Sequence, residues 1–243
     1  MKTIKSIFTL LFFLVTTTSC NKTANESDSS AELKTVKEEA QETVYASDVI
    51  PFFDDWNLIL GDGSNAGNVN DFEHKDFFFT ENDADSDWIV YKAPNAGDTH
   101  GTSNNTRSEL AQVKKWYPAT ANDKLTATLK VMNVSATGDA RVAASHAVVV
   151  GQIHSADKHE NEPLKIFYKK FPGHTKGSVF WHYEINTAGD DNSKRWDYST
   201  AVWGNDFSVV GTDANTSPKE PKDGIALGEE FSYEIEVKDG IMN

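Results

Sequence analysis

Two short segments of the chain carry side chains that can recognise an anion and move a proton. In the first, strand-like alternation places Arg107 and Glu109 on one face. In the second, Gln152 and His154 share a face, while Ile153 points the other way, toward the expected core. A guanidinium, an amide and an imidazole can together bind a carboxylate and transfer a proton. The same residues also admit a structural interpretation, in which Arg107 and Glu109 form an ion pair and His154 only ends a strand.

The segments that must position these side chains have the sequence pattern of β-strands. The clearest is residues 125–131, where apolar side chains alternate with Thr and Lys, the period of a strand with one buried face. Similar runs are separated by turn-forming clusters of Gly, Asn, Asp and Pro. They cover 87–92, 107–116, 142–154, 164–171, 178–186, 198–203 and 231–237. No long stretch has the helical period, so the sequence predicts an all-β sandwich, jelly roll or barrel of antiparallel strands.

The two chemical segments also match known motifs. The Arg-Ser-Glu-Leu run at 107–110 and the Gln-Ile-His run at 152–154, in this order and about 45 residues apart, resemble two of the three signature motifs of polysaccharide lyase family 7, the alginate lyases. The resemblance covers roughly Val49 to the end of the chain. It implies a β-jelly roll of two antiparallel sheets, with the substrate in a groove on the concave sheet.

The resemblance further implies a reaction and a role for each residue. Arg107 and Gln152 would neutralise the carboxylate of a 4-linked uronate, and His154 would act at the C5 proton. That proton is poorly acidic because the adjacent carboxylate is already anionic, so hydrogen bonds must offset the charge of the enolate-like state. Loss of the 4-oxygen leaves an unsaturated sugar, with no water consumed and no metal or cofactor required. A neutral imidazole, with an ordinary pKa of about 6.5, suits the base.

The sequence departs from the family pattern at two places. The first motif commonly continues with a second Arg, and here that position is Ala111, so one basic contact is absent or supplied elsewhere. The third motif, a strand that carries the catalytic Tyr, is not found in these 243 residues. The chain also ends just after a predicted strand and an Asp239-Gly240 hairpin turn, with a return strand of three residues. We therefore expect a domain truncated at its C-terminus, which by itself would be inactive or nearly so.

Charge is distributed unevenly along the chain. The formal net charge of -14 argues against a protein that coats nucleic acid. Residues 101–200, however, contain 13 basic and 10 acidic residues, and both motifs lie in this part. A cationic site for a polyanion fits here, although an ordinary solvated face gives the same count. The candidate substrate contacts beside the motif residues are Glu109, Lys124, Lys130, Lys165 and Lys169.

The N-terminal residues have the pattern of an export signal. Two lysines precede an apolar run, too short to span a bilayer, that leads to small residues and Cys20, the only cysteine of the chain. Residues 1–20 resemble a bacterial lipoprotein signal, in which the Cys is lipidated and anchors the protein to a membrane; the alternative is a secreted protein with a stray thiol. Residues 21–46 are predicted to be a flexible acidic tether, and residues 47–243 the folded domain. The expected location is the bacterial cell envelope, with the outer membrane favoured.

Other classes of function fit less well. The spacing of His154, His159 and Glu160 is not that of a helical zinc motif, so no metal is expected, and no pair of strand carboxylates indicates a glycosidase. The predicted function is a monomeric lyase that cleaves alginate by β-elimination to unsaturated oligosaccharides. The alternatives are a noncatalytic carbohydrate-binding jelly roll and a lyase acting on another polyuronate. Loops over the groove would decide between mannuronate and guluronate, and between internal and terminal cleavage.

Overall fold

The computed structural model describes residues 3–7, 43–101, 103–140, 144–156, 162–186, 195–206 and 219–243, and almost every regular element in these segments is a β-strand. The first sheet has the strand order β14 (Ile241–Met242), β13 (Glu230–Lys238), β7 (Asn122–Lys130), β1 (Thr3–Ile7), β5 (Asp87–Tyr91) and β4 (Phe78–Asn82). The second contains β11 (Arg195–Trp203), β10 (Lys176–Asn186), β9 (Leu164–Lys169) and β8 (Ala147–Ile153), with β12 (Ile225–Ala226) paired to β10. The third consists of β3 (Asn65–Gly67), β2 (Trp56–Ile59) and β6 (Glu109–Gln112). The helical elements described are α1 (Ala46–Val49) and the 3-10 turns Phe53–Asp55 and Pro118–Thr120.

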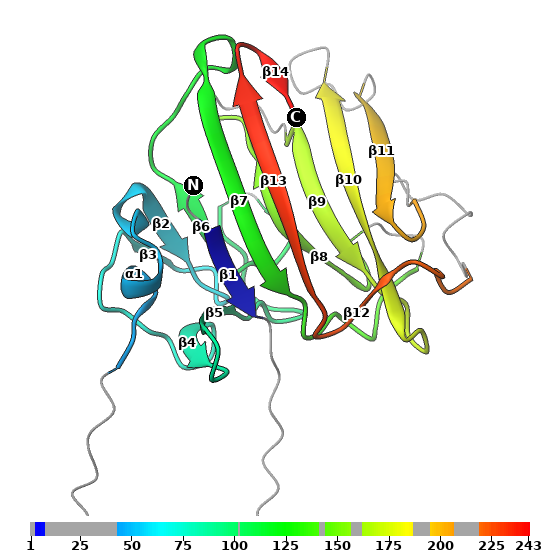
Figure 1. Ribbon diagram of the computed structural model, residues 1–243, viewed down its shortest axis with the longest axis horizontal. Coiled ribbons are helices and arrows are strands. Elements are labelled where there is room, and N and C mark those ends of the chain that lie inside the picture. The colour runs from blue at the N-terminus through cyan, green and yellow to red at the C-terminus, as the bar shows by residue number, and fades with distance from the viewer. Residues whose placement is uncertain are drawn as a thin grey trace, which may run out of the picture.

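The pairing confirms the predicted all-β, antiparallel architecture. Among the described strands, only β1 pairs in parallel, with β5 and with β7. The sandwich differs from the expected pair of sheets because β3, β2 and β6 form a separate small sheet. In the described segments no backbone ladder joins β6 to β8, so two edge strands that carry the motif residues remain in separate sheets. Figure 1 shows β7 and β13 side by side, with α1, β2 and β3 at one end of the molecule and β10 and β11 at the other.

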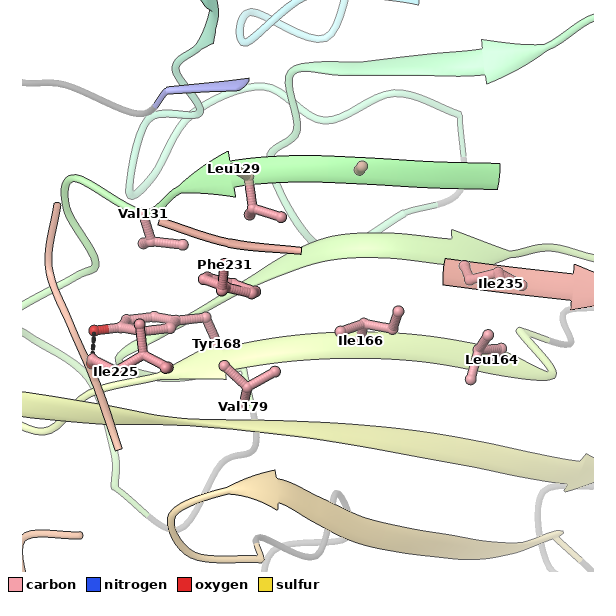
Figure 2. Packing of buried hydrophobic residues seen from close by; sticks show 10 residues of the cluster. Leu129, Val131, Leu164, Ile166, Tyr168, Val179, Ile225, Phe231 and Ile235 are labelled. Carbon is pink, nitrogen blue, oxygen red and sulfur yellow. Dashed lines mark hydrogen bonds between the residues drawn. The ribbon is translucent and has the colours of Figure 1, made fainter. Parts of the chain in front are cut away.

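The main core lies between the first and second sheets and follows directly from the period-two pattern. Buried residues come from β7, β13, β9, β10 and β12, and Figure 2 shows how they interdigitate. They are Ala127, Leu129, Val131, Leu164, Ile166, Tyr168, Val179, Ile225, Phe231 and Ile235. Burying a large apolar side chain fully contributes about 1.5–3 kcal/mol, so this cluster fixes which face of β8 and β9 points away from the core.

A second cluster holds the small sheet in place. Residues of α1, β2, β4 and β5 pack together, among them Leu58 and Phe78, and Leu110 of β6 packs against them. Ala46 is 1% exposed in this cluster, so the folded unit includes the last residue of the predicted tether. The Ser108 hydroxyl donates a hydrogen bond to the carbonyl of Phe77 at 2.9 Å, which attaches the start of β6 to the same cluster.

The structure describes the C-terminal hairpin completely and the N-terminal residues only in part. Asp239 and Gly240 have φ angles of 50° and 80°, the paired positive values of a tight hairpin turn, and β13 pairs with β14 as the Asp-Gly signal predicts. At the other end, β1 falls within the predicted export signal, whereas Cys20 and residues 21–42 lie outside the described residues. No helix in the described segments is long and apolar enough to cross a membrane.

Candidate active site

Arg107 lies just before β6, with its guanidinium held by two neighbours. One terminal nitrogen, Nη1, donates to Glu109 Oε1 at 2.9 Å, and the other, Nη2, donates to the Ser103 hydroxyl. The alternation expected from the sequence is present, because Ser108 is buried while Arg107 and Glu109 keep about a quarter of their side-chain surface exposed. Arg107 Nε is buried and has no hydrogen-bond partner among the described residues. Two of the five N–H donors of the guanidinium are engaged, so the group is oriented and Nη1 and Nη2 each keep a second N–H that a ligand can use.

Gln152 and His154 come from the end of β8, on the face of the second sheet that points away from the main core. We call this the site face. Gln152 lies directly across from Lys165 of β9, and the residues that flank Lys165 are both part of the main core. Ile153 also packs against the main core. Because side chains alternate along a strand, Gln152 and His154 share the site face, as the sequence predicts.

Glu109 brings the two motifs together. Its Oε1 receives the hydrogen bond from Arg107, and its Oε2 receives a longer one, of 3.4 Å, from Gln152 Nε2. A single carboxylate thus links the edge strand of the small sheet to the edge strand of the second sheet. Arg107 and Gln152, the two residues expected to contact a substrate carboxylate, consequently lie within two hydrogen bonds of each other.

His154 has a geometry that suits a base. Its Nδ1 lies 2.7 Å from the carbonyl oxygen of Ser155. A carbonyl only accepts hydrogen bonds, so Nδ1 carries the proton and a neutral ring keeps its lone pair on Nε2. Nε2 lies 3.9 Å from Glu162 Oε1, and 47% of the His154 side chain is exposed. The lone pair is therefore accessible from solvent and lies near the Glu162 carboxylate.

A row of polar residues continues across the site face. Lys165 lies across from Gln152, His182 of β10 lies across from Lys165, and Ser199 of β11 lies across from His182. Lys165 Nζ is 3.0 Å from Glu162 Oε2 and 4.0 Å from Glu184 Oε2. Of the three residues that follow Gln152 in this row, only Lys165 was expected at the site from the sequence. For His182 the signal was present, because polar and apolar residues alternate along residues 182–186 and so mark the face opposite the core.

The remaining lysines expected at the site are placed elsewhere. Lys124 and Lys130 alternate with the core-facing residues of β7, so they lie on the outer face of the first sheet, where they pair with Glu234 and Asp83 at 2.9 Å. Lys169 is on the site face but only 1% exposed, with its Nζ 5.2 Å from the ring centre of Phe171. Burial lowers the pKa of Lys169 to about 8. Of the four lysines, the structure brings Lys165 alone to the motif residues.

A lysine that sequence reasoning missed lies beyond His154. Lys115 Nζ is 3.4 Å from the carbonyl oxygen of Ala156, two residues after His154. It follows β6 by three residues, past Ala111, which stands where the motif commonly has a second Arg. A cation on this side of the site is thus available from the loop after β6.

Metal ligands do not gather at this site in the part of the chain that the structure describes. No three His, Cys, Asp or Glu side chains there form a group that could hold a metal ion. His159 and Glu160, considered in the sequence analysis, lie outside the described residues. The side chains that do gather at the site, a guanidinium, an amide and an imidazole, can bind a carboxylate and transfer a proton.

Comparison with known proteins gives the site a family context. The family model for alginate lyases matches residues 50–243. An alginate lyase of Klebsiella pneumoniae is 29% identical over 225 residues, which is 75% of this chain and 67% of the relative. The crystal structure of the exolytic PL7 alginate lyase AlyA5 from Zobellia galactanivorans is similar with a TM-score of 0.75 and 64% identity, over 82% of this chain and 63% of that chain. The alginate lyase structure from Klebsiella pneumoniae has a TM-score of 0.59 and 27% identity, over 76% of this chain and 73% of that one. These solved structures confirm the expected jelly-roll fold.

Proposed function

The chain belongs to the alginate lyase family, and from this we propose that the protein cleaves alginate by β-elimination. The observation that carries the proposal is the side-chain contact across β6 and β8. Glu109 links Arg107 to Gln152, and His154 follows on the same face with an accessible Nε2. We infer that the guanidinium, the amide donor and the neutral base act together on a single bound sugar ring.

The proposed reaction uses each group once. Arg107 and Gln152 donate hydrogen bonds to the uronate carboxylate, which stabilises the additional negative charge that develops when the C5 proton leaves. His154 Nε2 takes that proton, and the electron pair of the C5–H bond forms the C4–C5 double bond as the C4–O bond breaks. The departing oxygen takes up a proton from a general acid. Glu162, 3.9 Å from Nε2, stabilises the imidazolium that results.

We further propose that cleavage occurs from a chain end. The relative AlyA5 is named exolytic, and 64% of its aligned residues are shared with this chain. Part of the site face is also filled by an apolar cluster of Phe167, Phe171 and Phe180, with Ala147 and Ala201 packed against it. The polar residues Lys165 and His182 lie on the other part of the face, beside Gln152. Chromatography of early products distinguishes the modes, because terminal cleavage releases small products of one size from the start.

The activity is tested by the ultraviolet absorbance of the new double bond. The full-length protein should raise the absorbance of an alginate solution, and R107A or H154A should lower kcat/KM by at least about 100-fold. K124A is the matched control, because Lys124 lies on the outer face of the first sheet. An unchanged rate in either site variant would remove that residue from the mechanism.

Two outcomes would favour another function. Cleavage of pectate without cleavage of alginate would change the substrate to another polyuronate. Binding of alginate without any rise in absorbance, measured by calorimetry on the same preparation, would instead indicate a noncatalytic carbohydrate-binding domain. In that case R107A should still weaken binding, because the guanidinium would remain the carboxylate contact.

We also propose that the protein is a lipoprotein of the bacterial cell envelope. The support is in the sequence, where the only cysteine follows a short apolar run and small residues. A lipid on Cys20 would hold the folded unit near the membrane on a tether of residues 21–46, where exported polysaccharide is accessible.

A further inference from the structure

β8 contains an irregularity immediately before the Gln-Ile-His motif. Val149 lies across from Phe167 of β9, and the next paired residue, Gly151, lies across from Ile166. Two steps on β8 therefore correspond to one step on β9, and Val150 is the extra residue of a β-bulge.

The bulge decides which way the motif side chains point. Phe167 belongs to the apolar cluster on the site face, so its partner Val149 is on that face too. Regular alternation from Val149 would put Gln152 and His154 on the core side and Ile153 on the site face. The extra residue shifts the alternation of side chains by one position, so Gln152 lies across from Lys165 on the site face.

The bulge is held from the opposite sheet. Tyr233, on the core-facing side of β13, donates its hydroxyl to the carbonyl of Val150 at 2.8 Å. A Cβ on Gly151 would lie 2.5 Å from the Tyr233 hydroxyl oxygen and 2.8 Å from its Cζ. Glycine is thus required at 151 for space, because the phenol occupies the volume that a side chain would need. Burial raises the pKa of Tyr233 far above its usual value, so the hydroxyl remains a donor.

We propose that Tyr233 is a positioning residue for the reaction: it pins the bulge at Val150 and Gly151 and thereby aims Gln152 and His154 at the sugar. This rests on the proposed lyase function. Tyr233 touches no substrate itself, since its hydroxyl lies in the main core and acts through the backbone of β8.

Y233F tests the proposal against a matched control. Y168F also removes a core tyrosine hydroxyl that donates to a backbone carbonyl, that of Ile225 at 3.0 Å, but this bond is to β12 and not to the bulge. Both variants should lose similar thermal stability. Only Y233F should lower kcat/KM on alginate, by about tenfold or more, because small misplacements of catalytic groups are costly. A fall in kcat with KM nearly unchanged would mark a loss of alignment at the transition state.

A second measurement does not depend on turnover. In labelled protein, the side-chain amide resonances of Gln152 and the ring resonances of His154 should shift in Y233F and stay in place in Y168F. Wild-type activity and unshifted resonances in Y233F would overturn the proposal, and so would equal losses of activity in both variants. If the full-length wild-type protein leaves alginate intact, the proposed function fails, whereas the resonances still report whether Tyr233 aims the motif.

Discussion

At the scale of single residues, Glu109 is the side chain whose role changes most once its contacts are known. A carboxylate is a poor partner for an anionic sugar, and this one is already engaged on both oxygens, by Arg107 and by Gln152. Its negative charge is offset by the guanidinium 2.9 Å away. Both oxygens of Glu109 thus hold Arg107 and Gln152 in place, and we propose that it acts through these two residues and not as a direct contact for the uronate carboxylate.

Substitution of Glu109 tests this role, because the direction in which kcat and KM change distinguishes holding from repulsion. E109A should lower kcat/KM by about 100-fold, because Arg107 and Gln152 lose the group that aligns them. E109Q should fall between E109A and wild type, since the new amide oxygen still accepts from Arg107 while its nitrogen faces the Gln152 amide. Steady-state kinetics on alginate measures both. If Glu109 mattered only by repelling the substrate, both variants would bind more tightly, and a lower KM with unchanged kcat would contradict the holding role.

Lys165 and Lys169 provide a second comparison, within one strand and on one face. Lys165 is 17% exposed beside Glu162 and lies across from Gln152, whereas Lys169 is 1% exposed. K165M should weaken the binding of oligouronates from acid hydrolysis of alginate by about threefold to tenfold, the value of one partly exposed charged contact. K169M should bind them as tightly as wild type. Calorimetry at pH 7 tests both, and equal losses would contradict the assignment of Lys165 alone to the site.

At the scale of the elements, the β4–β5 hairpin is attached to β7 by one polar cluster. Asp83 accepts hydrogen bonds from Trp88 Nε1 at 2.6 Å and from Lys130 Nζ at 2.9 Å. The same ammonium lies 4.1 Å from the centre of the Trp88 ring. The hydrogen bond from Lys130, then that from Trp88, lowers the pKa of Asp83 to about 2 from its ordinary value of 3.8.

This cluster predicts a dependence of stability on pH. The folded-state pKa of Asp83 lies below the unfolded value, so its contribution is complete above about pH 4 and is lost as the pH falls toward 2. D83N should therefore be less stable than wild type at pH 6, and the difference should shrink between pH 4 and 2. Urea unfolding across this range measures it, with D85N, on the same turn, as the control. A difference that stays constant with pH would exclude the ionised carboxylate as its source.

The elements also show how far sequence alone predicts this fold. Residues 125–131 alternate cleanly, so β7 and its buried face were predictable, and Asp239-Gly240 specified the β13–β14 turn. The bulge at Val150 was not, because the residue that pins it, Tyr233, is distant in sequence. The pair of motifs predicted side chains that the structure joins through Glu109, but the lysines could not be sorted by sequence. Which face of a strand meets which sheet depends on pairing between distant segments.

At the scale of the whole molecule, the site lies where two independently packed units meet. Arg107 and Glu109 are positioned by the cluster around Leu58 and Phe78, and Gln152 is positioned by the main core. In the described residues the two edge strands are joined by side chains, not by a backbone ladder. The relative placement of Arg107 and Gln152 therefore depends on how both units attach to the first sheet.

Lipid anchoring is tested on the whole protein in a bacterial host. The wild type should appear in the membrane fraction and incorporate labelled palmitate. A lipoprotein cysteine carries more than one lipid chain, and two or more chains are enough for stable anchoring. C20S should incorporate no label and lose its membrane association. A wild-type protein recovered unlabelled in the soluble fraction would contradict the anchor and favour a secreted enzyme.

Processing at Cys20 would also remove β1, which gives a prediction about the assembly of the first sheet. β1 lies between β5 and β7, but β7 retains its full-length pairing with β13, and β5 retains its pairing with β4. The side chain of Lys130 on β7 also contacts Asp83 and Trp88 of the β4–β5 hairpin, so it links the two strands that flank β1. A protein that begins at residue 21 should therefore unfold cooperatively with a Tm within about 4 °C of the unprocessed chain, a difference of about 1 kcal/mol.

In a K130A background the same deletion should lower the Tm clearly more. Differential scanning calorimetry of the four proteins, with and without the deletion and with and without K130A, measures this coupling. Loss of the cooperative transition on deletion alone would show instead that β1 is an integral strand and that residues 3–7 are retained in the folded protein.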